Sequence, residues 1–510
     1  MVRSTARTTL EATSSAAQDV PIGSNPRASA SHDAYASLPP ESPLKSPPSP
    51  RYRVAMCCDF FYPRLGGVEM HIWSLAQCLL QLGHKVIILT HAIEESPHLP
   101  PARPLARAPP RQRVGVRWMT NGLKVYYLPV RPLVDNVTYP TFVTGFALVR
   151  SILLREQIDI VHGHQATSTF MHECLVQAKT MLARPLKTVY TDHSLFGFAD
   201  AASVHLNKVM KFSLSTIDHA ICVSHTCKEN LVLRASISPD LVSTIPNAVD
   251  ASKFTPPETT PTGERINVVI ISRLVYRKGI DLVGKAIQIV CAACPQVHFI
   301  IGGDGPKRLL LEEMREKHRL HDRVHLYGAV PHANVRKVLC EGHIFLNSSL
   351  TESFCIAILE AAACGLFVVS TRVGGVPEVL PPDMIQFAAE TTPEALAQAV
   401  LDALPRVTTV NRQEFHARVA AMYNWADVAR RTERVYATVL ARPRMALLER
   451  LQRYYGMGPI AGALACVIAA VLHVYLCILD VWRPTDEIEE AVEWTRPPSK
   501  EKEKENGKVW

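Results

Sequence analysis

Short apolar runs rich in β-branched residues alternate with longer amphipathic stretches from Arg53 onward, and this alternation is the strongest constraint on the fold. It is typical of a parallel sheet covered by helices. It predicts a helix over 69–82 that ends at Gly83, and strands at 54–58, 85–90, 125–128, 158–162, 188–191 and 220–223. The predicted fold class is therefore α/β.

The alternation then occurs a second time. After residues 245–250 and a Pro- and Thr-rich stretch at 251–264, strands are predicted at 267–272, 298–302, 324–327, 344–347 and 366–370. We expect two Rossmann-like βα domains, over 51–248 and 249–440. Two such domains in succession place a cleft between the carboxyl ends of their sheets, where ligands bind in open α/β folds.

Composition excludes several classes of function. A net charge of +8 is mild for 510 residues, so nucleic acid is not an expected partner. The 13 cysteines lie mostly in apolar runs, which is typical of reduced, buried thiols in a protein that faces the cytosol. Cys291 and Cys294 have no second pair to complete a zinc site, so helix packing explains them better. Residues 1–50 are rich in Ser, Ala and Pro, lack the apolar core of a secretory signal, and predict a disordered tail.

A long uncharged run lies near the C-terminus. Residues 454–479 contain no Asp, Glu, Lys or Arg, and as a helix of 1.5 Å per residue they extend about 39 Å, against about 30 Å for a bilayer core. Arginines precede the run and acidic residues follow it. We therefore predict a basic juxtamembrane segment (441–456), a transmembrane helix (457–479) and a charged tail (480–510), with the large N-terminal part in the cytoplasm. A buried core helix is the alternative.

Three loops in the βα pattern suit an anionic ligand. Residues 63–69 (PRLGGVE) place Gly66 and Gly67 at a predicted helix N-terminus, where backbone N–H groups and the helix dipole favour negative charge. Residues 272–279 (SRLVYRKG) put cations directly after the first strand of the second domain, and a solvated turn is their plainer explanation. Residues 302–306 (GGDGP) close the next strand and allow a second close approach of backbone at Gly303.

Two carboxylates in an apolar segment are the strongest indication of function in the sequence. In residues 352–361 (ESFCIAILEA), Glu352 and Glu360 stand eight positions apart, so a largely helical segment would separate them by about 12 Å along its axis. That roughly matches the distance between hexose and ribose in a nucleotide sugar. Each carboxylate can accept two hydroxyl hydrogen bonds, which is what a vicinal diol offers. The residues alone therefore predict transfer from a nucleotide sugar to a lipid, without specifying which sugar or lipid.

Together with Arg273, Lys278 and residues 374–378 (GGVPE), these motifs resemble the retaining GT-B glycosyltransferases of family 4. Within that family, residues 60–63 (FFYP), 161–164 (VHGH) and 191–200 (TDHSLFGFAD), with the single C-terminal span, closely resemble the PIG-A type, the catalytic subunits of phosphatidylinositol N-acetylglucosaminyltransferase. The likeness covers about residues 53–485, and residues 191–200 are its most specific part.

The resemblance implies transfer of N-acetylglucosamine from UDP-GlcNAc to phosphatidylinositol, the first step of glycosylphosphatidylinositol anchor synthesis, by a multisubunit complex of the endoplasmic reticulum membrane. It implies an acceptor-side first domain and a nucleotide-sugar second domain, and a front-face, oxocarbenium-like path without a cofactor. The implied diphosphate ligands are Arg273 and Lys278. Glu352 is the implied ligand of the sugar, Glu360 is that of the ribose, and His164 is the implied catalytic histidine. On the donor side lie Gly66, Gly67 and Gly303, and on the acceptor side lie His193 and Asp192.

His193 has an equally good structural explanation. No Asp-x-Asp motif is placed to hold a metal, so no metal ligand is expected, and cations and helix N-termini must meet the charge of the leaving diphosphate. Two alternatives stay open: a lipid glycosyltransferase with another sugar donor or lipid acceptor, and a silent, membrane-tethered scaffold protein, against which the complete set of cations and carboxylates argues. Residues 94–113, rich in Pro and Arg, predict a disordered insertion, with membrane or partner contact as the sharper alternative.

Overall fold

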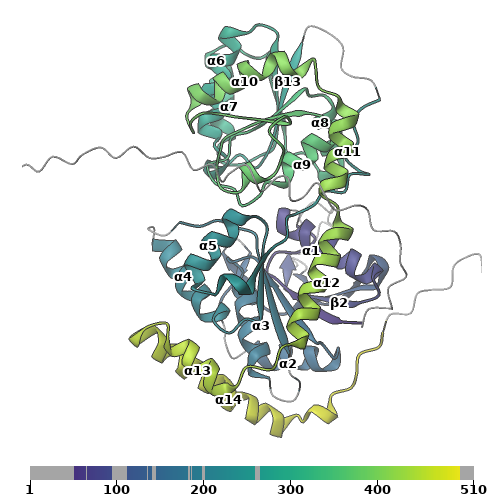
Figure 1. Cartoon of the computed structure of the whole chain (residues 1–510), viewed down its shortest axis with the longest axis vertical. Helices are drawn as coiled ribbons and strands as arrows, with labels where there is room; N and C mark the ends of the chain where they lie inside the picture. The colour runs from purple at the N-terminus through teal and green to yellow at the C-terminus, as the bar shows by residue number, and fades with distance from the viewer. Residues whose placement is uncertain are drawn as a thin grey trace, which may run out of the picture. The chain divides into compact units, whose positions relative to one another are not determined.

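The computed structural model describes residues 51–493 except 65, 95–111, 135, 141–144, 182–183, 185, 198–200 and 259–264. The expected tail at 1–50, most of the insertion at 94–113, and residues 494–510 lie outside the described part. Within that part the chain forms the two βα domains that the alternation predicts (Figure 1).

The first domain is built on an eight-stranded sheet of order β12-β11-β10-β9-β1-β2-β6-β5. Its strands are β1 (Arg53–Cys57), β2 (Lys85–His91), β5 (Gly115–Met119), β6 (Leu123–Leu128), β9 (Ile160–His164), β10 (Lys187–Asp192), β11 (His219–Cys222) and β12 (Val242–Thr244). Its helices are α1 (Gly67–Gln81), α2 (Phe146–Arg155), α3 (Thr169–Thr180), α4 (Ala201–Leu214) and α5 (His225–Ala235). Two short antiparallel pairs, β3 (Ile93–Glu94) with β4 (Gln112–Arg113) and β7 (Pro132–Val134) with β8 (Val137–Thr138), complete the domain.

Parallel pairing explains why most strands of this sheet are uniformly apolar. Helices cover both faces of a parallel sheet, so β1, β2, β6, β9, β10 and β11 are buried along nearly all of their length. The exception is β5, which pairs antiparallel to β6 at the sheet edge and is largely exposed. The strand predicted at 158–162 begins two residues later, at Ile160, and ends at His164.

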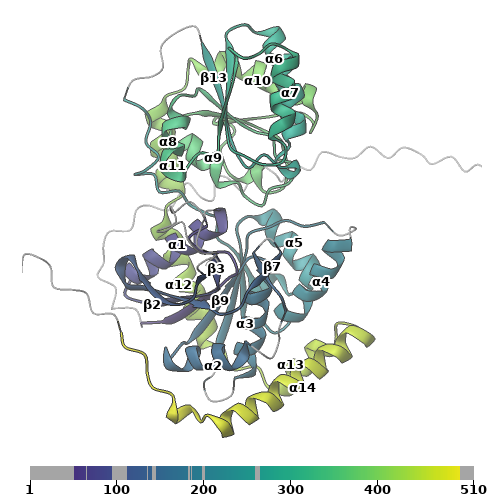
Figure 2. The same cartoon turned by 180° about the vertical axis from the view of Figure 1, so that it is seen from behind.

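The second domain holds a six-stranded, all-parallel sheet of order β15-β14-β13-β16-β17-β18. Its strands are β13 (Ile266–Ile271), β14 (Val297–Gly302), β15 (Val324–Gly328), β16 (Ile344–Asn347), β17 (Phe367–Ser370) and β18 (Ile385–Phe387). Its helices are α6 (Ile280–Ala293), α7 (Arg308–Lys317), α8 (His332–Cys340), α9 (Ile356–Ala363), α10 (Pro393–Val407) and α11 (Arg412–Met422), as Figure 2 shows from behind.

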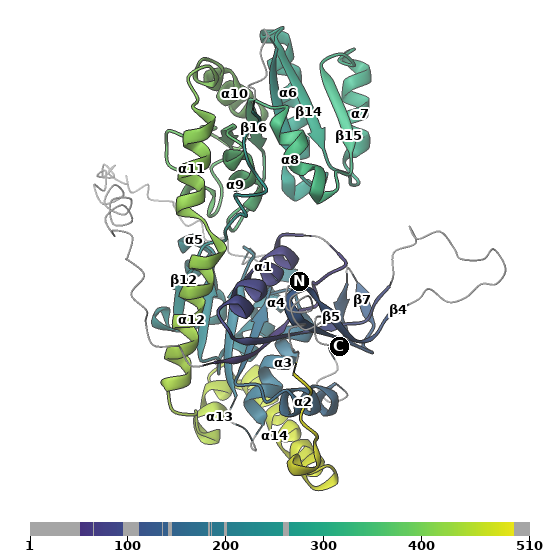
Figure 3. The same ribbon diagram turned by 90° about the vertical axis from the view of Figure 1, so that its right-hand side faces the viewer.

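The next helix, α12 (Trp425–Ala441), returns to the first domain. It lies within residues 249–440, the range expected for the second domain, yet it runs beside α1 (Figure 3). Its apolar side chains Val428, Val435 and Tyr436 are buried with β1 and α1 in one hydrophobic cluster. The Tyr436 hydroxyl also lies 2.7 Å from Nδ1 of His162 on β9. The chain therefore crosses between the domains twice.

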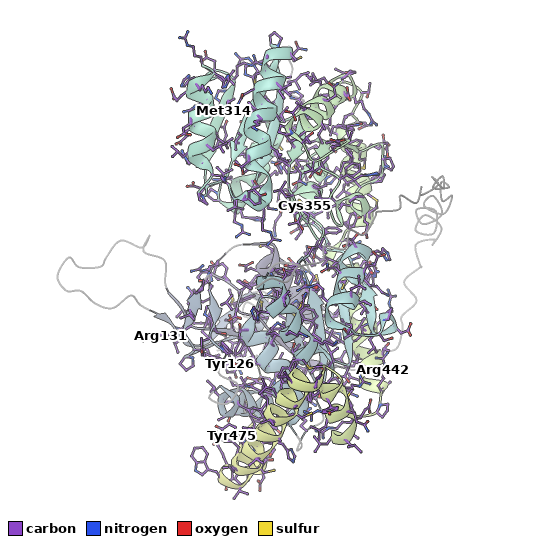
Figure 4. All side chains as sticks on the ribbon, turned by 90° about the vertical axis from the view of Figure 1, so that its left-hand side faces the viewer. Tyr126, Arg131, Met314, Cys355, Arg442 and Tyr475 are labelled. Carbon is purple, nitrogen blue, oxygen red and sulfur yellow. The ribbon has the colours of Figure 1, made fainter. Side chains whose placement is uncertain are left out.

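Two C-terminal helices complete the described chain: α13 (Leu447–Tyr455) and α14 (Pro459–Trp482). Among the described residues, α14 is the one helix long and apolar enough to cross a membrane. One of its faces packs on α13 and α3, and Tyr475, labelled in Figure 4, lies against Phe146 of α2. Its other face exposes large apolar side chains at helical spacing: Ile460, Leu464, Val467, Val471, Val474, Ile478 and Val481.

The end of α14 also contacts the first domain. Asp480 pairs with the buried Arg150 of α2 at 2.6 Å, and the Ala491 N–H donates to the Arg155 carbonyl at 2.8 Å. A cavity of about 820 Å³ lies beside these contacts, lined by α2, β6 and the last turn of α14. None of the site residues predicted from the sequence lines it.

Candidate active site

Lys278 and Glu352 meet between two loops of the second domain. Lys278 lies in the turn that follows β13, and Glu352 in the loop that follows β16, which is the neighbour of β13 in the sheet. The two side chains form an ion pair, and Ser349 Oγ donates to the same carboxylate oxygen at 2.9 Å. Burial lowers the pKa of the Lys278 ammonium, but the Glu352 carboxylate raises it, and the net shift is upward. Lys278 is therefore a fixed positive charge at neutral pH.

Glycines hold the Glu352 loop in place. A Cβ atom on Gly374, whose φ is +52°, would lie 2.0 Å from the Glu352 carbonyl, and one on Gly375 would lie 2.1 Å from the Ser353 carbonyl. Gly279, at φ +66°, similarly allows the Ser348 carbonyl to approach the Lys278 turn. Only glycine fits such contacts, so these positions build the site through backbone packing.

The segment from Glu352 to Glu360 is only partly helical. Helix α9 begins at Ile356, and Cys355 before it, labelled in Figure 4, has a left-handed backbone (φ 74°). The prediction that both carboxylates lie on one helix, about 12 Å apart along its axis, is therefore wrong, because the first four residues form a loop. A non-glycine residue in this conformation is energetically costly, and such residues cluster at functional sites.

Glu360 stays on α9 and points to a different partner. Its carboxylate lies 3.4 Å from Nε2 of His332, the first residue of α8, and this hydrogen bond raises the pKa of His332. The two glutamates are thus held separately, one by a lysine and one by a histidine. His332 carried no sequence signal, because a single histidine after a loop has no characteristic spacing.

Arg273 and the first glycine loop face one another across the domains. The Arg273 side chain is exposed. Burial raises the pKa of Glu69, and although the charges of Arg273 and Arg64 lower it, the net shift is upward. The Glu69 carboxylate lies over Gly66, where a Cβ would meet it at 2.5 Å, and Gly67 lies within contact range of Ile356 at the start of α9. The Gly66–Gly67 loop therefore sits beside the segment that carries Glu352.

Gly303 has a packing role. At φ +141°, a Cβ there would lie 1.8 Å from the Ser272 carbonyl, and its N–H donates to the Gly328 carbonyl at 2.7 Å. The loop after β14 thus supports the segment that carries Arg273, and the Gly303 N–H already has a partner.

Four histidines gather where β9 and β10 end. His164 Nδ1 lies 3.3 Å from His193 Nε2, and the His71 ring on α1 lies 4.6 Å from the His193 ring, centroid to centroid. The His162 ring lies 4.2 Å from the His164 ring, centroid to centroid, but both nitrogens of His162 are hydrogen-bonded, to Tyr436 and Thr191 at 2.7 Å each. Burial lowers the pKa of all four, to about 4 for His71 and about 3 for His162, so the rings are neutral at pH 7.

The histidine group is joined directly to the Glu352 loop. Ser353 Oγ donates to the His193 carbonyl. Because Ser353 follows Glu352 and His193 follows Asp192, this hydrogen bond joins the two segments. Asp192 itself is fully buried, and it accepts hydrogen bonds from the Tyr190 hydroxyl at 3.0 Å and the Ser194 N–H at 3.2 Å. Burial raises the pKa of this carboxyl to about 6. The geometry favours a structural Asp192 that shapes the turn bearing His193.

A second link between the domains was not predicted. The Glu378 carboxylate accepts hydrogen bonds from the N–H groups of His225 and Thr226, at 2.6 and 2.9 Å, and so caps α5 of the first domain. The sequence motif at residues 374–378 includes Glu378 but predicted no role for it. His71 and Glu69 were also missed, although residues 63–69 end at Glu69.

The comparisons with known proteins agree with this arrangement. The family model "PIGA (GPI anchor biosynthesis)" matches residues 109–200, and "Glycosyl transferases group 1" matches residues 252–414. The chain is 53% identical over 442 residues to a phosphatidylinositol N-acetylglucosaminyltransferase subunit of Arabidopsis thaliana, covering 87% of this chain and 94% of that protein. It is 46% identical over 450 residues to the corresponding protein of Homo sapiens, covering 88% of each.

Solved structures share the fold. Sucrose-phosphate synthase from Thermosynechococcus elongatus matches with a TM-score of 0.61 at 20% identity, over 77% of this chain and all of that one. HepE from Anabaena in complex with UDP and glucose matches with a TM-score of 0.57 at 14% identity, over 76% of this chain and all of that one. These matches show that the chain has the GT-B fold. The two curated relatives and the first family model show that the chain belongs to the PIG-A family of phosphatidylinositol N-acetylglucosaminyltransferase subunits.

Proposed function

We propose that the chain transfers N-acetylglucosamine from UDP-GlcNAc to phosphatidylinositol, with retention of configuration, as the first step of glycosylphosphatidylinositol anchor synthesis. The observation that carries the proposal is the Lys278–Glu352 ion pair, held beside His193 by the Ser353 hydrogen bond. It puts a fixed cation and a carboxylate of the second domain next to neutral histidines of the first. The names of the relatives supply the sugar and the lipid.

The two cations suit the leaving diphosphate. Lys278 is held by Glu352, whereas the Arg273 side chain is exposed and has no hydrogen bond or ion pair to any described residue. As the bond between sugar and phosphate breaks, negative charge grows on the diphosphate, and preorganised cations stabilise it more than they stabilise the bound donor. No divalent metal is required for this role, and the described residues near Lys278 form no carboxylate cluster for one.

Glu352 and His164 suit the sugar. A carboxylate beside the sugar ring strengthens its interactions as the ring acquires positive charge, and Lys278 holds Glu352 in one orientation. His164 is neutral, so its ring can accept or donate a hydrogen bond to a sugar hydroxyl. In this proposal Glu360, which contacts His332, binds the ribose, and the departing phosphate assists deprotonation of the acceptor. Gly66 and Gly67 provide the close backbone approach on the donor side.

We further propose that the protein works as the catalytic member of a multisubunit complex in the endoplasmic reticulum membrane. In this proposal α14 crosses the bilayer once and the two βα domains lie in the cytoplasm. The exposed apolar face of α14 supports membrane attachment, because a helix that is apolar on all sides and half exposed does not fit a soluble core.

One experiment tests donor and acceptor together. Membranes containing the complex are incubated with phosphatidylinositol and, in separate reactions, with radiolabelled UDP-GlcNAc, UDP-glucose or GDP-mannose. We expect label in the organic phase from UDP-GlcNAc alone, and its loss with Lys278→Met. Lipid-linked label from another donor, or equal labelling without phosphatidylinositol, would require a different substrate assignment.

A further inference from the structure

The histidine group contains three rings that the transfer chemistry does not require together. His71 comes from α1, His164 from the end of β9 and His193 from the turn after β10. One ring nitrogen from each lies within 4.8 Å of the other two. The sequence predicted no metal ligand because it has no suitably placed Asp-x-Asp motif, and this histidine group departs from that expectation.

The spacing of these nitrogens suits a tetrahedral ion. Zinc binds imidazole nitrogen at about 2.0–2.1 Å, which places two nitrogens of a tetrahedral site about 3.4 Å apart. His164 Nδ1 and His193 Nε2 are 3.3 Å apart. The third nitrogen, from His71, lies within 4.8 Å of the other two, so each of its separations has to shorten by at most about 1.4 Å to reach this spacing.

The surroundings orient His71 as a ligand. Its Nδ1 lies 2.8 Å from the Asn247 side-chain oxygen and donates a hydrogen bond to it. A neutral imidazole carries one N–H and one lone pair, so this bond leaves the lone pair of Nε2 available. Metal-binding histidines almost always donate their second nitrogen in this way. His162 provides the contrast, because both of its nitrogens are already engaged.

The chemistry of the group selects the class of ion. All three rings are buried or half-buried, and each offers an imidazole nitrogen to the group. Neutral imidazole binds zinc, copper, nickel and cobalt, whereas magnesium and calcium prefer oxygen. Three histidines with an open fourth position are a known form of zinc site.

We propose that His71, His164 and His193 form a binding site for a divalent transition metal, with Zn²⁺ as the best match, and that the bound ion inhibits transfer. A nitrogen of His164 that binds the ion is lost to the donor sugar, and His193 is fixed away from the acceptor. The inhibitory part of this inference rests on the proposed function, whereas metal binding does not.

Binding is measured first, on the complex purified with its partner proteins and freed of metal by chelation. Equilibrium dialysis against ZnCl₂ should show zinc bound by the wild-type complex that is missing with His71→Gln. Asn247→Ala should weaken that binding by about ten- to a hundredfold, because it removes the group that orients His71. His225→Gln, an exposed histidine of the same domain, should bind as the wild type does. Melting temperatures of all variants show that each is folded.

Activity is measured next, as sugar transfer at increasing ZnCl₂, normalised to the metal-free rate of each variant. Zinc should inhibit the wild type, a chelator should reverse the inhibition, and His71→Gln should need at least about tenfold more zinc. Equal zinc binding by the wild-type and His71→Gln complexes would refute the site. Zinc bound at the site without any change in transfer would refute the inhibition alone. A complex that binds zinc but transfers no N-acetylglucosamine would refute the proposed function and leave the site standing.

Discussion

At the residue scale, Glu352 and Glu360 should fail in different ways. In the proposed site, Glu352→Gln removes the charge that faces the sugar and also the partner of Lys278, so kcat should fall by roughly a hundredfold. Glu360→Gln weakens a contact remote from the breaking bond, so its effect should appear mainly in KM. Steady-state kinetics on the purified complex measure both, with Glu341→Gln, which contacts Tyr327 at the surface, as the control.

Neither glutamate should form a covalent adduct with the sugar, because the proposed path is a front-face transfer. An unchanged kcat for Glu352→Gln, or a trapped glycosyl ester on Glu352, would reassign these roles.

Asp192 should make stability depend on pH. Its pKa in the folded protein, about 6, is raised above the unfolded value of 3.8, so its contribution is most favourable below pH 3.8 and is lost as the pH rises through 6. The full loss corresponds to about 3 kcal/mol. Asp192→Asn keeps an oxygen to accept the Tyr190 and Ser194 hydrogen bonds but cannot ionise.

The melting temperature of Asp192→Asn, relative to the wild type, should therefore rise between pH 5 and pH 8. The buried histidines titrate in both proteins, so their effect cancels in the difference. A difference that stays constant across this range would show that Asp192 is not a buried, ionising carboxyl.

At the scale of elements, α5 depends on a cap from the other domain. Glu378→Ala leaves the N–H groups of His225 and Thr226 without their carboxylate, and should cost about 1–3 kcal/mol. We expect a melting temperature several degrees lower, with Glu229→Ala, an exposed change in the same helix, staying within about 0.5 kcal/mol of the wild type. Equal effects of the two changes would mean that the cap contributes nothing.

Sequence periodicity predicted the buried parallel strands and the helices between them, because these segments are apolar on the faces that pack. It did not predict β5, which is an exposed edge strand without an apolar face. Nor did it predict the return of α12 to the first domain, since an amphipathic helix has an apolar face that does not specify which sheet it covers.

The candidate site shows the same limit. Motifs gave Arg273, Lys278, Glu352 and Glu360, because charged residues in apolar surroundings stand out in a sequence. Asp192 is fully buried, and His71 lies close to His164. Both facts depend on how distant strands and helices pack, and the spacing of residues in a sequence does not specify that packing.

At the scale of the whole molecule, α14 is the helix that we propose anchors the two domains to a membrane. If α14 spans the bilayer, residues 480–493 must leave their contacts with Arg150 and Arg155, because these residues would lie on the opposite side from the first domain. We expect protease added to sealed microsomes to destroy epitopes upstream of residue 450 and to spare one placed after residue 493. Detergent should remove that protection. Loss of the tail epitope from sealed microsomes would show that α14 lies along the first domain without crossing the membrane.

The double crossing of the chain has a mechanical consequence. The segment that leaves the first domain and the segment that returns to it are joined, because the Val249 N–H donates to the Tyr423 carbonyl at 3.4 Å. A hinge made of two joined segments allows the domains to rotate, but it resists sliding and twisting, since either motion would stretch one segment relative to the other. In the proposed function, the domains would then open to admit a nucleotide sugar and close over it by rotation about one axis. The cations of the second domain would return to the same position against the histidines of the first domain after each turnover.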